Sequence, residues 1–409
     1  MTRKLKNKYG PWVTGEDFFN RDDEIRLLSR TIDNGGTHVL IVAPRRVGKT
    51  SLIRETFRRL GENRAHYLIF LDVQNCTTPE DVMVAVSMGA SRHRTLAKKV
   101  TDVFSTFLKQ ISETVESIGA PDLLEIKLRQ GIKGDWQFKG RRLLSNLAEA
   151  DRPIVICMDE LPIMVSRLLR KSPEEAEIFL SWLRQIMGEF QEKICFIVSG
   201  SIGLEPILKR YGLSHTIGHL QPLHIEPWGG QTAGECLDLL ARTAGIDWPE
   251  ELSARIADLL GVCIPHHVQM FFGYLYQDLF KEDRRNPSIE DIERVYQRSM
   301  LSTRGHAELA DYEERLLRVL DNEKIPLALD LLSEAAINGI LKSAMCDVLF
   351  DRSGLKDKGP VLREVLDVLE HDGYLVRHET MDGWRFSSNL IRDWWKKRFS
   401  QSYVNPSKQ

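Results

Sequence analysis

Four short apolar runs divide the first half of the chain, and stretches with apolar residues at helical spacing separate them. Residues 38–42, 66–73, 153–158 and 194–198 are rich in Val, Ile, Leu and Phe, and each has the length of a buried strand. Strands that alternate with helices predict a mostly parallel sheet with helices on both faces. The first 225 residues are therefore expected to form an α/β domain.

The pattern changes after Gln221-Pro222. Residues 226–303 contain several helical patterns and no convincing strand, which predicts a small helical bundle. The next part of the chain has helical segments near 311–321, 327–335, 339–350 and 360–371. Residues 374–378 and 384–388 then flank an Asp382-Gly383 turn, which predicts a β-hairpin, and a helix over 389–399 follows. Helices plus a hairpin are the outline of a winged helix. The expected domains are 1–225, 226–305 and 306–409.

The loop after the first apolar run has the composition of a phosphate-binding loop, or Walker A motif. A strand over 38–42, a loop and a helix over 51–60 follow one another. Backbone N–H groups of such a loop can surround a phosphate chain, while Lys49 reaches the β- and γ-phosphates and the Thr50 hydroxyl ligates Mg²⁺. The predicted nucleotide-binding residues are Ala43, Pro44, Arg45, Arg46, Val47, Gly48, Lys49, Thr50 and Ser51.

Two features of this loop leave alternatives open. Ala43 stands where the strict motif has Gly, which is tolerable if that position does not need a positive φ. Arg45 and Arg46 either are solvated loop charges, the reading we favour slightly from sequence, or add positive potential near the nucleotide. An ordinary strand–helix turn with a surface lysine is the alternative to the motif as a whole.

The third apolar run ends in two acids, a Walker B pattern. Asp159 is expected to hold Mg²⁺, and Glu160 to orient or deprotonate the attacking water. A strand followed by two exposed acids is the alternative, which a phosphate loop about a hundred residues upstream makes much weaker.

Two further segments could contact a nucleotide. The fourth apolar run ends in Ser199-Gly200-Ser201, where either serine could sense the γ-phosphate or simply form a turn. The segment Gly261–His267 reads as a helix start with Pro265 at its first position, or as a lid contact with the nucleotide. Adjacent histidines point to different helix faces, which argues against His266 and His267 as a ligand pair. The catalytic candidates are Glu160, Lys49 and Ser199.

Composition limits the function classes. A formal net charge of −2 gives no global field for nucleic acid or membrane, although basic residues gather at both ends, with Arg3, Lys4, Lys6 and Lys8 at one and Arg392, Lys396, Lys397, Arg398 and Lys408 at the other. The six cysteines form no CxxC pair, so a reducing cytoplasm is the expected compartment. We expect neither a signal peptide nor a membrane span.

Together these elements resemble the archaeal-type ATPases of the STAND group, within the AAA+-like P-loop ATPases. The resemblance rests on FFNRDDEI, APRRVGKTSL, MDELP, the SGS strand end, GVCIPHH and LIRDWWKKRF, in that order. It implies an ATPase core, a helical lid, a C-terminal winged helix, and domain packing and self-association that differ between the ATP and ADP states. It also implies that Phe19 and Arg21 lie near the adenine or hold the lead-in, and that Pro265 approaches the nucleotide from the lid.

Three functions follow as hypotheses. The first is a slow ATP-hydrolysing switch that relays its nucleotide state through the winged helix to a protein partner. The second is a DNA-binding initiator, loader or transposition regulator that contacts double-stranded DNA through Arg385, Lys396, Lys397 and Arg398. The third uses the winged helix only for protein contacts, through Trp384, Trp394, Trp395 and Phe399. Because Trp394 and Trp395 are adjacent on a helix, we expect one to be buried and the other to lie at an edge or interface.

Overall fold

A computed structural model describes residues 4–112, 125, 128–129, 131–132, 134–401 and 403–404. Residues Arg3 and Lys408 of the expected terminal patches, and part of the predicted 79–150 insert, lie outside this description. The chain forms two compact units. The sheet unit comprises Arg21–Val42 and Leu52–Ile225, and the helical unit comprises Met1–Asn20, Ala43–Ser51 and Glu226–Gln409.

The sheet unit is built on five parallel strands in the order β2-β3-β4-β1-β5. All four predicted strands are present, and a fifth pairs with β1 along one edge. Their bounds are β1 His38–Val42, β2 Tyr67–Asp72, β3 Ile154–Asp159, β4 Ile194–Val198 and β5 Leu220–His224. Every residue of β3 and β4 is buried, as expected for central strands covered on both faces.

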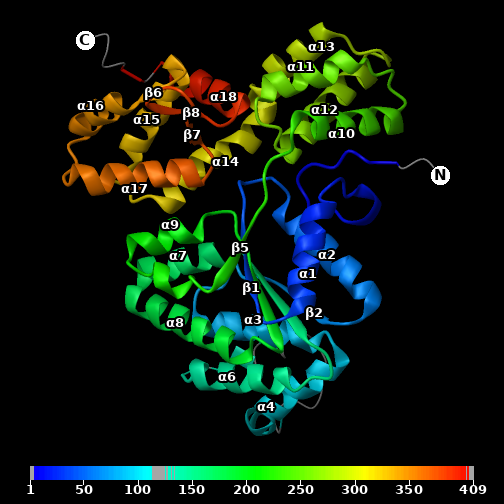
Figure 1. Cartoon of the computed structure of the whole chain (residues 1–409), viewed down its shortest axis with the longest axis vertical. Coiled ribbons are helices and arrows are strands. Elements are labelled where there is room, and N and C mark those ends of the chain that lie inside the picture. Colours follow the sequence, from blue (N-terminus) through cyan, green and yellow to red (C-terminus); the bar gives the residue numbers. More distant parts are fainter. Residues whose placement is uncertain are drawn as a thin grey trace. The chain divides into compact units, whose positions relative to one another are not determined.

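Helices cover both faces of this sheet, with α1 and α2 on one side and α7 and α8 on the other (Figure 1). The helices of this part of the chain are α1 Asp22–Asn34, α2 Lys49–Asn63, α3 Pro79–Ser91, α4 Arg94–Ser112, α6 Trp136–Ala148, α7 Leu161–Lys171, α8 Pro173–Phe190 and α9 Leu204–Arg210, with a short 3-10 turn η2 at Ser214–Thr216. The predicted parallel sheet with helices on both faces is therefore confirmed.

The helical unit contains two groups of elements after the short turn η1, Gly15–Asp17. The first group is α10 Gly230–Ala244, α11 Glu250–Leu260, α12 Pro265–Lys281, α13 Ile289–Val295 and the π-helical turn η3 Tyr296–Met300. The second group is α14 Thr303–Val319, α15 Ile325–Asn338, β6 Leu341–Lys342, α16 Ser343–Ser353, α17 Lys358–His371, β7 Leu375–Arg377, β8 Gly383–Phe386 and α18 Asn389–Phe399. Its three strands form an antiparallel sheet in the order β6-β8-β7.

Local sequence signals explain several helix starts. Ser288 and Asp291 form a complete capping box at α13, and Ser172 accepts from the Glu175 N–H at α8. Helix α1 begins without a side-chain cap, because the residue before it is Arg21, which has a left-handed backbone and makes no capping hydrogen bond.

Three details of the second group differ from expectation. Helix α14 begins at Thr303, well before the helical segment expected near 311–321. Gly383 belongs to β8, and residues 378–382 form the hairpin loop instead of Asp382-Gly383. Gly383 has a φ of 151°, and a Cβ there would lie 2.3 Å from the Leu341 carbonyl oxygen, so the close approach of β6 requires glycine.

Both adjacent tryptophans of α18 are buried, which corrects the expectation that one lies at an edge. Trp394 and Trp395 are 3% and 0% exposed, and Trp384 is also buried. The reason is that α18 packs against α15 and also against α11, so two of its faces are covered. These aromatic side chains form core and do not provide an exposed docking surface.

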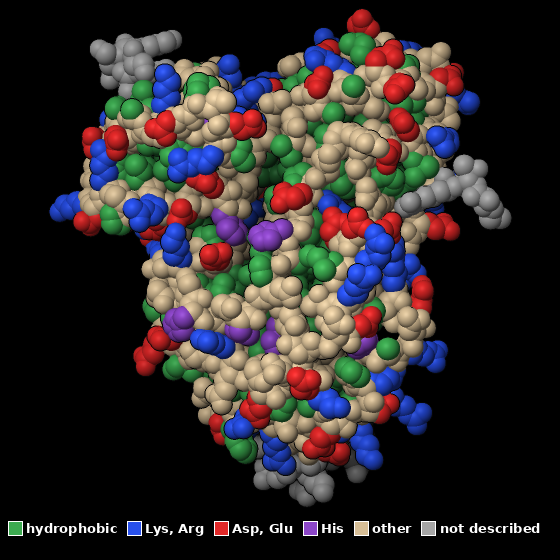
Figure 2. Space-filling view, viewed as in Figure 1, with side chains coloured by type: hydrophobic (Ala, Val, Ile, Leu, Met, Phe, Trp, Pro, Cys, Tyr) green, Lys and Arg blue, Asp and Glu red, His purple; other side chains and the backbone are tan. Residues whose placement is uncertain are grey.

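No helix of the described chain combines the length and the apolar character needed to cross a membrane. Acidic and basic side chains are interspersed over the face drawn in Figure 2, in keeping with a net charge near zero.

Candidate nucleotide site

The phosphate loop leaves the carboxyl end of β1 and leads into the first turn of α2. Two of its residues have positive φ, Arg46 at 63° and Gly48 at 99°. Ala43 is not among the positive-φ residues, so the missing glycine costs the loop no backbone strain. A non-glycine residue such as Arg46 enters the left-handed region only at a cost, which the contacts around it must offset.

Lys49 lies over the loop that precedes it. Lys49 is only 8% exposed, and its ammonium donates to the carbonyl oxygens of Ala43 and Pro44 at 3.1 and 3.0 Å. The ammonium is thus directed into the loop, where it supplies positive potential for a phosphate chain.

Ser51 has a role that the sequence did not indicate. Its hydroxyl accepts a hydrogen bond from the Val13 N–H at 3.1 Å, which ties the N-terminal lead-in to the start of α2. The Ser51 side chain therefore has a structural partner in the lead-in.

Four polar residues gather at the carboxyl edge of the sheet, and we call Asp159, Glu160, Ser199 and Ser201 the acid edge. Leu40, Val198 and Met158 are in register across β1, β4 and β3. Asp159 and Ser199 each follow a residue of that row, on strands parallel to the strand that leads into the phosphate loop. The sheet therefore carries its acids and its loop connection at one edge.

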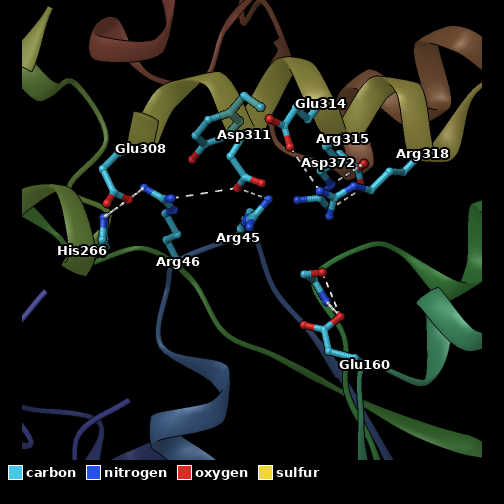
Figure 3. A network of polar contacts seen from close by, with 12 residues as sticks. Arg45, Arg46, Glu160, His266, Glu308, Asp311, Glu314, Arg315, Arg318 and Asp372 are labelled. Atoms are coloured by element: carbon cyan, nitrogen blue, oxygen red, sulfur yellow. Dashed lines mark hydrogen bonds and ion pairs between the residues drawn. The ribbon is translucent and has the colours of Figure 1, made fainter. Parts of the chain in front are cut away.

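Glu160 is held in place by the strand next to its own. Its Oε2 accepts from the Ser201 N–H at 2.9 Å and from the Ser201 hydroxyl at 2.8 Å, as drawn for Glu160 in Figure 3. Glu160 has a φ of 62° and precedes α7. A left-handed residue turns the chain sharply here, so that the carboxylate faces the end of β4 and does not continue the strand.

Ser199 and Asp159 lie deeper in the same edge. Ser199 is fully buried, its N–H donates to the Met158 carbonyl, and its hydroxyl has no hydrogen-bond partner among the described residues. A buried hydroxyl without a partner is costly, and a phosphate oxygen or a water would satisfy it. Asp159 is 5% exposed, and its carboxylate accepts from the Glu160 N–H at 3.2 Å.

Arg45 and Arg46 are not solvated, which corrects the reading favoured from sequence. Arg45 pairs with Asp311 of α14, and Arg46 Nη1 lies 2.6 Å from Glu308 Oε2 of the same helix. The two arginine side chains are only 23% and 15% exposed. With His266 of α12, these five residues form what we call the loop clamp (Figure 3).

The charge states within the loop clamp follow from burial and neighbours. A hydrogen bond with His266 and the nearby Arg46 guanidinium lower the pKa of Glu308 to about 2, so this carboxylate is ionised at any physiological pH. Burial lowers the pKa of His266 below its usual value. His266 Nε2 lies 2.9 Å from Arg46 Nη1 and 3.2 Å from Glu308 Oε2, so it accepts from Arg46 when it carries no hydrogen and donates to Glu308 when it carries one.

The lead-in and lid candidates occupy structural positions. Phe19 packs edge-to-face on Trp228, with ring centroids 5.5 Å apart. Arg21 is buried and pairs with Glu24 at 2.7 Å. Pro265 is the buried first residue of α12, which confirms the predicted helix start and places His266 directly after it.

The partners in the loop clamp were missed by sequence reasoning. Glu308 and Asp311 lie one turn apart on α14, among other charged residues of a helix whose start was not predicted. A possible signal was the polar stripe at 308, 311 and 315, at helical spacing between apolar positions. Among the described residues no group of three or more His, Cys, Asp or Glu could hold a metal by itself.

The order of the sheet, with a central strand between the loop strand and the acid strand, defines the class of protein. It is a P-loop nucleoside triphosphatase with its acids and loop connection at the carboxyl edge. Residues 18–234, more than half of the chain, match a family described as an ATPase domain predominantly from Archaea. The chain belongs to this family of archaeal ATPases.

Solved structures share this fold. The Walker-type ATPase PABY2304 of Pyrococcus abyssi has a TM-score of 0.63 and 18% identity, with 95% of this chain and 98% of that chain covered. The ORC2 protein of Aeropyrum pernix, solved as ADPNP–ADP complexes, has a TM-score of 0.56 and 15% identity, with 94% of each chain covered. At these identities the likeness concerns the fold. No curated protein sequence matches the chain.

Proposed function

We propose that this chain is an ATP-binding and slowly ATP-hydrolysing molecular switch of the AAA+/STAND type. In this proposal the phosphate loop holds ATP or ADP, and the acid edge carries out hydrolysis. The nucleotide state then reaches a protein partner, or a second copy of the chain in the ATP state, through the C-terminal group of elements. The observation that carries the proposal is the acid edge, where Ser201 holds Glu160 and the buried Ser199 hydroxyl has no partner among the residues that the structure describes.

The residues of the acid edge suit the steps of hydrolysis. Glu160 can accept a proton from the attacking water while Ser201 fixes the direction of its carboxylate. Ser199 can donate its hydroxyl hydrogen bond to a γ-phosphate oxygen, which would remove the cost of its burial. Lys49 can exchange the carbonyls of Ala43 and Pro44 for phosphate oxygens, because an ionised acceptor binds an ammonium more strongly than a neutral one.

The donor set fits a nucleotide-bound magnesium ion. Mg²⁺ prefers oxygen ligands and usually takes one or two from the protein, with the rest from phosphates and water. The Thr50 hydroxyl and the Asp159 carboxylate are oxygen ligands of this kind, and no larger cluster of ligands occurs in the described chain. When bound, the ion would neutralise charge that develops on the phosphates.

The C-terminal elements suit a relay more than a catalytic role. Helices α15, α16 and α17 with the sheet β6-β8-β7 follow the order of a winged helix, which we take as the output module. The helical group α10–α13 would then be the lid, with boundaries near 226–305 and 306–409. The lid and the C-terminal elements share one hydrophobic core. They are also joined by hydrogen bonds, from the Ser388 hydroxyl to the Leu260 carbonyl and from the Asn389 amide to the Asp258 carbonyl.

A DNA-binding loader is the second candidate, favoured by the exposed lysines Lys396 and Lys397 at the end of α18. Arg398 is engaged with Glu313 at 2.7 Å, and Arg385 lies 4.0 Å from Glu379. The helix pair α16–α17 opposes this function, because residues 343–371 contain six acidic and four basic side chains. A duplex contact would therefore depend on α18 and the hairpin and not on α17.

Size-exclusion chromatography with light scattering separates these functions. The full chain is run with no nucleotide, with ADP and with ATP, each with and without duplex DNA at low salt. A switch changes its mass or elution with ATP alone, whereas a loader changes only when duplex is present and loses it as salt rises. A chain that binds no ATP in any of these runs contradicts both.

A further inference from the structure

Helix α14 presents three charged side chains on one face along its length. Glu308, Asp311 and Arg315 are separated by three and four residues, the spacing that places side chains on successive turns of the same face. Figure 3 shows these side chains leaving α14 together, with Glu314 and Arg318 paired to each other on the same helix.

The first half of this face holds the phosphate loop. Asp311 pairs with Arg45, Glu308 pairs with Arg46, and Arg46 Nη2 also lies 3.9 Å from Asp311. These pairs are less than one-third exposed on both sides, so solvent screens them less than ordinary surface pairs. Arg46 has a φ of 63°, which costs a non-glycine residue free energy, and its ion pair with Glu308 is a contact that can offset this cost.

The second half of the face is fixed to the output module. Arg315 donates two hydrogen bonds to Asp372, Nε at 2.8 Å and Nη2 at 2.7 Å, and both side chains are 3% exposed. Asp372 directly follows α17, and the Tyr374 hydroxyl donates to the Tyr312 carbonyl at 2.6 Å. A movement of α14 at this end must therefore displace the end of α17 and the start of β7.

We propose that α14 responds to the binding of a nucleotide in the phosphate loop. Arg45 and Arg46 exchange Asp311 and Glu308 for phosphate oxygens when a triphosphate binds, and the Arg315–Asp372 pair transmits the release of α14 to the output module. This inference rests on the proposed function and names its relay.

Charge competition is the physical basis of this exchange. A triphosphate and the two carboxylates are alternative anionic partners for the same two guanidinium groups, and a guanidinium binds phosphate in a two-pronged geometry as readily as carboxylate. Glu308 stays ionised down to a pH of about 2. Glu308 therefore competes with phosphate for Arg46 at any ordinary pH. An anion that binds Arg46 in its place breaks the contact between the phosphate loop and α14.

The test uses two matched variants of α14 in the full chain. In the first, Glu308→Gln and Asp311→Asn remove both carboxylates at nearly constant volume. The control is Glu314→Gln on the same helix, whose partner Arg318 is itself 49% exposed. The measurements are the affinity for a non-hydrolysable ATP analogue with Mg²⁺, and the hydrogen–deuterium exchange of residues 303–319 with and without it.

The expected result is faster exchange over 303–319 when the wild-type chain binds the analogue. The double variant should exchange at that faster rate without nucleotide and bind the analogue about tenfold more tightly, because two partly buried pairs no longer compete. The control should behave as wild type. Arg46→Gly provides a second approach from the loop side, since glycine accepts the backbone of this position, and it too should release α14.

Three outcomes would overturn the inference. If the double variant binds the analogue with unchanged affinity, the ion pairs of Glu308 and Asp311 do not compete with the nucleotide. If its affinity is reduced, the two carboxylates orient the arginines toward phosphate. Normal binding by wild type with no change of exchange over 303–319 would show that α14 does not respond. If wild type binds no analogue at all, the proposed function itself has failed.

Discussion

The acid edge and the loop clamp both fix charged side chains, but the chain builds them in different ways. At the acid edge, Glu160 is held by Ser201, a residue 41 positions away at the end of the neighbouring strand. In the loop clamp, Arg46 contacts His266, 220 positions away, and Glu308 farther still. The first arrangement follows from the order of parallel strands, whereas the second depends on how helices from the later part of the chain pack.

The difference fits the division of tasks in the function that we propose. A catalytic carboxylate gains from a rigid position, and the sheet supplies it at one edge. A relay needs contacts that can be exchanged, and ion pairs between a loop and a helix can change partners without unfolding either element. The variants below are designed to break one arrangement while leaving the other intact.

The largest effect is expected for Asp372→Asn, which disrupts the anchor of α14. Burial alone would raise the pKa of Asp372, but the Arg315 guanidinium outweighs it and holds the pKa below the usual value. Removing one partner of a buried pair should therefore destabilise the helical unit by about 3–5 kcal/mol. Thermal and urea unfolding measure the loss, and the exposed Asp357→Asn serves as control. Equal stability of both variants would mean that the pair is dispensable.

Glu160→Gln should act on the acid edge alone. The amide cannot take a proton from water, so turnover should fall by about 100-fold while ATP affinity stays within about twofold of wild type. Phosphate release and equilibrium nucleotide binding check the two halves of this prediction, with the exposed Glu174→Gln as control. Undiminished turnover would assign the base to another residue.

A smaller effect is expected for Ser201→Ala, which removes one of the two hydrogen bonds to Glu160. The backbone N–H still donates, so kcat should fall only about fivefold, with KM unchanged. Ser201→Thr keeps the hydroxyl and should restore the rate. A variant whose KM rises as much as its kcat falls would place Ser201 in substrate binding and not in the positioning of Glu160.

The smallest expected effect is on the pH dependence of folding stability, through His267, the residue after His266 of the loop clamp. Burial lowers the pKa of His267 well below its usual value, and neither ring nitrogen has a partner among the described residues. Below pH about 6.5 the unfolded chain gains a proton that the folded chain excludes, so stability falls as pH falls, by about 1.4 kcal/mol from pH 7.5 to 5.5.

The variant His267→Phe should lose this share of the acid sensitivity, as the shift of the urea midpoint between the two pH values will measure. Replacing the exposed His215 with Asn serves as the matched control. An equal shift in wild type and His267→Phe would mean that His267 is not the group that titrates.

The sheet and its acids could be predicted from sequence because their signals are local. The apolar runs before Ala43 and before Asp159–Glu160 mark buried strands, and the parallel order brings their ends to one edge. Ser199 and Ser201 were both candidates, and the structure separates them, since Ser201 holds Glu160 while the Ser199 hydroxyl has no hydrogen-bond partner in the described part of the chain.

The loop clamp and the C-terminal core could not be predicted because they depend on packing over long separations. Nothing near Arg45 or Arg46 indicates that α14 will cover them, and helical spacing alone does not show which face of α14 meets the loop. Trp394 and Trp395 illustrate the same limit, because adjacency on one helix predicts one buried side only when a single neighbour covers it.

The measurement that tests the central claim most directly is equilibrium binding of a fluorescent ATP analogue, with Mg²⁺, to wild type and to Lys49→Ala. The account predicts saturable binding by wild type and a loss of at least about 100-fold in the variant, because Lys49 is the ammonium directed into the phosphate loop. The exposed Lys281→Ala should bind as wild type. Equal affinity of Lys49→Ala and wild type would contradict the claim that a triphosphate is held by this loop.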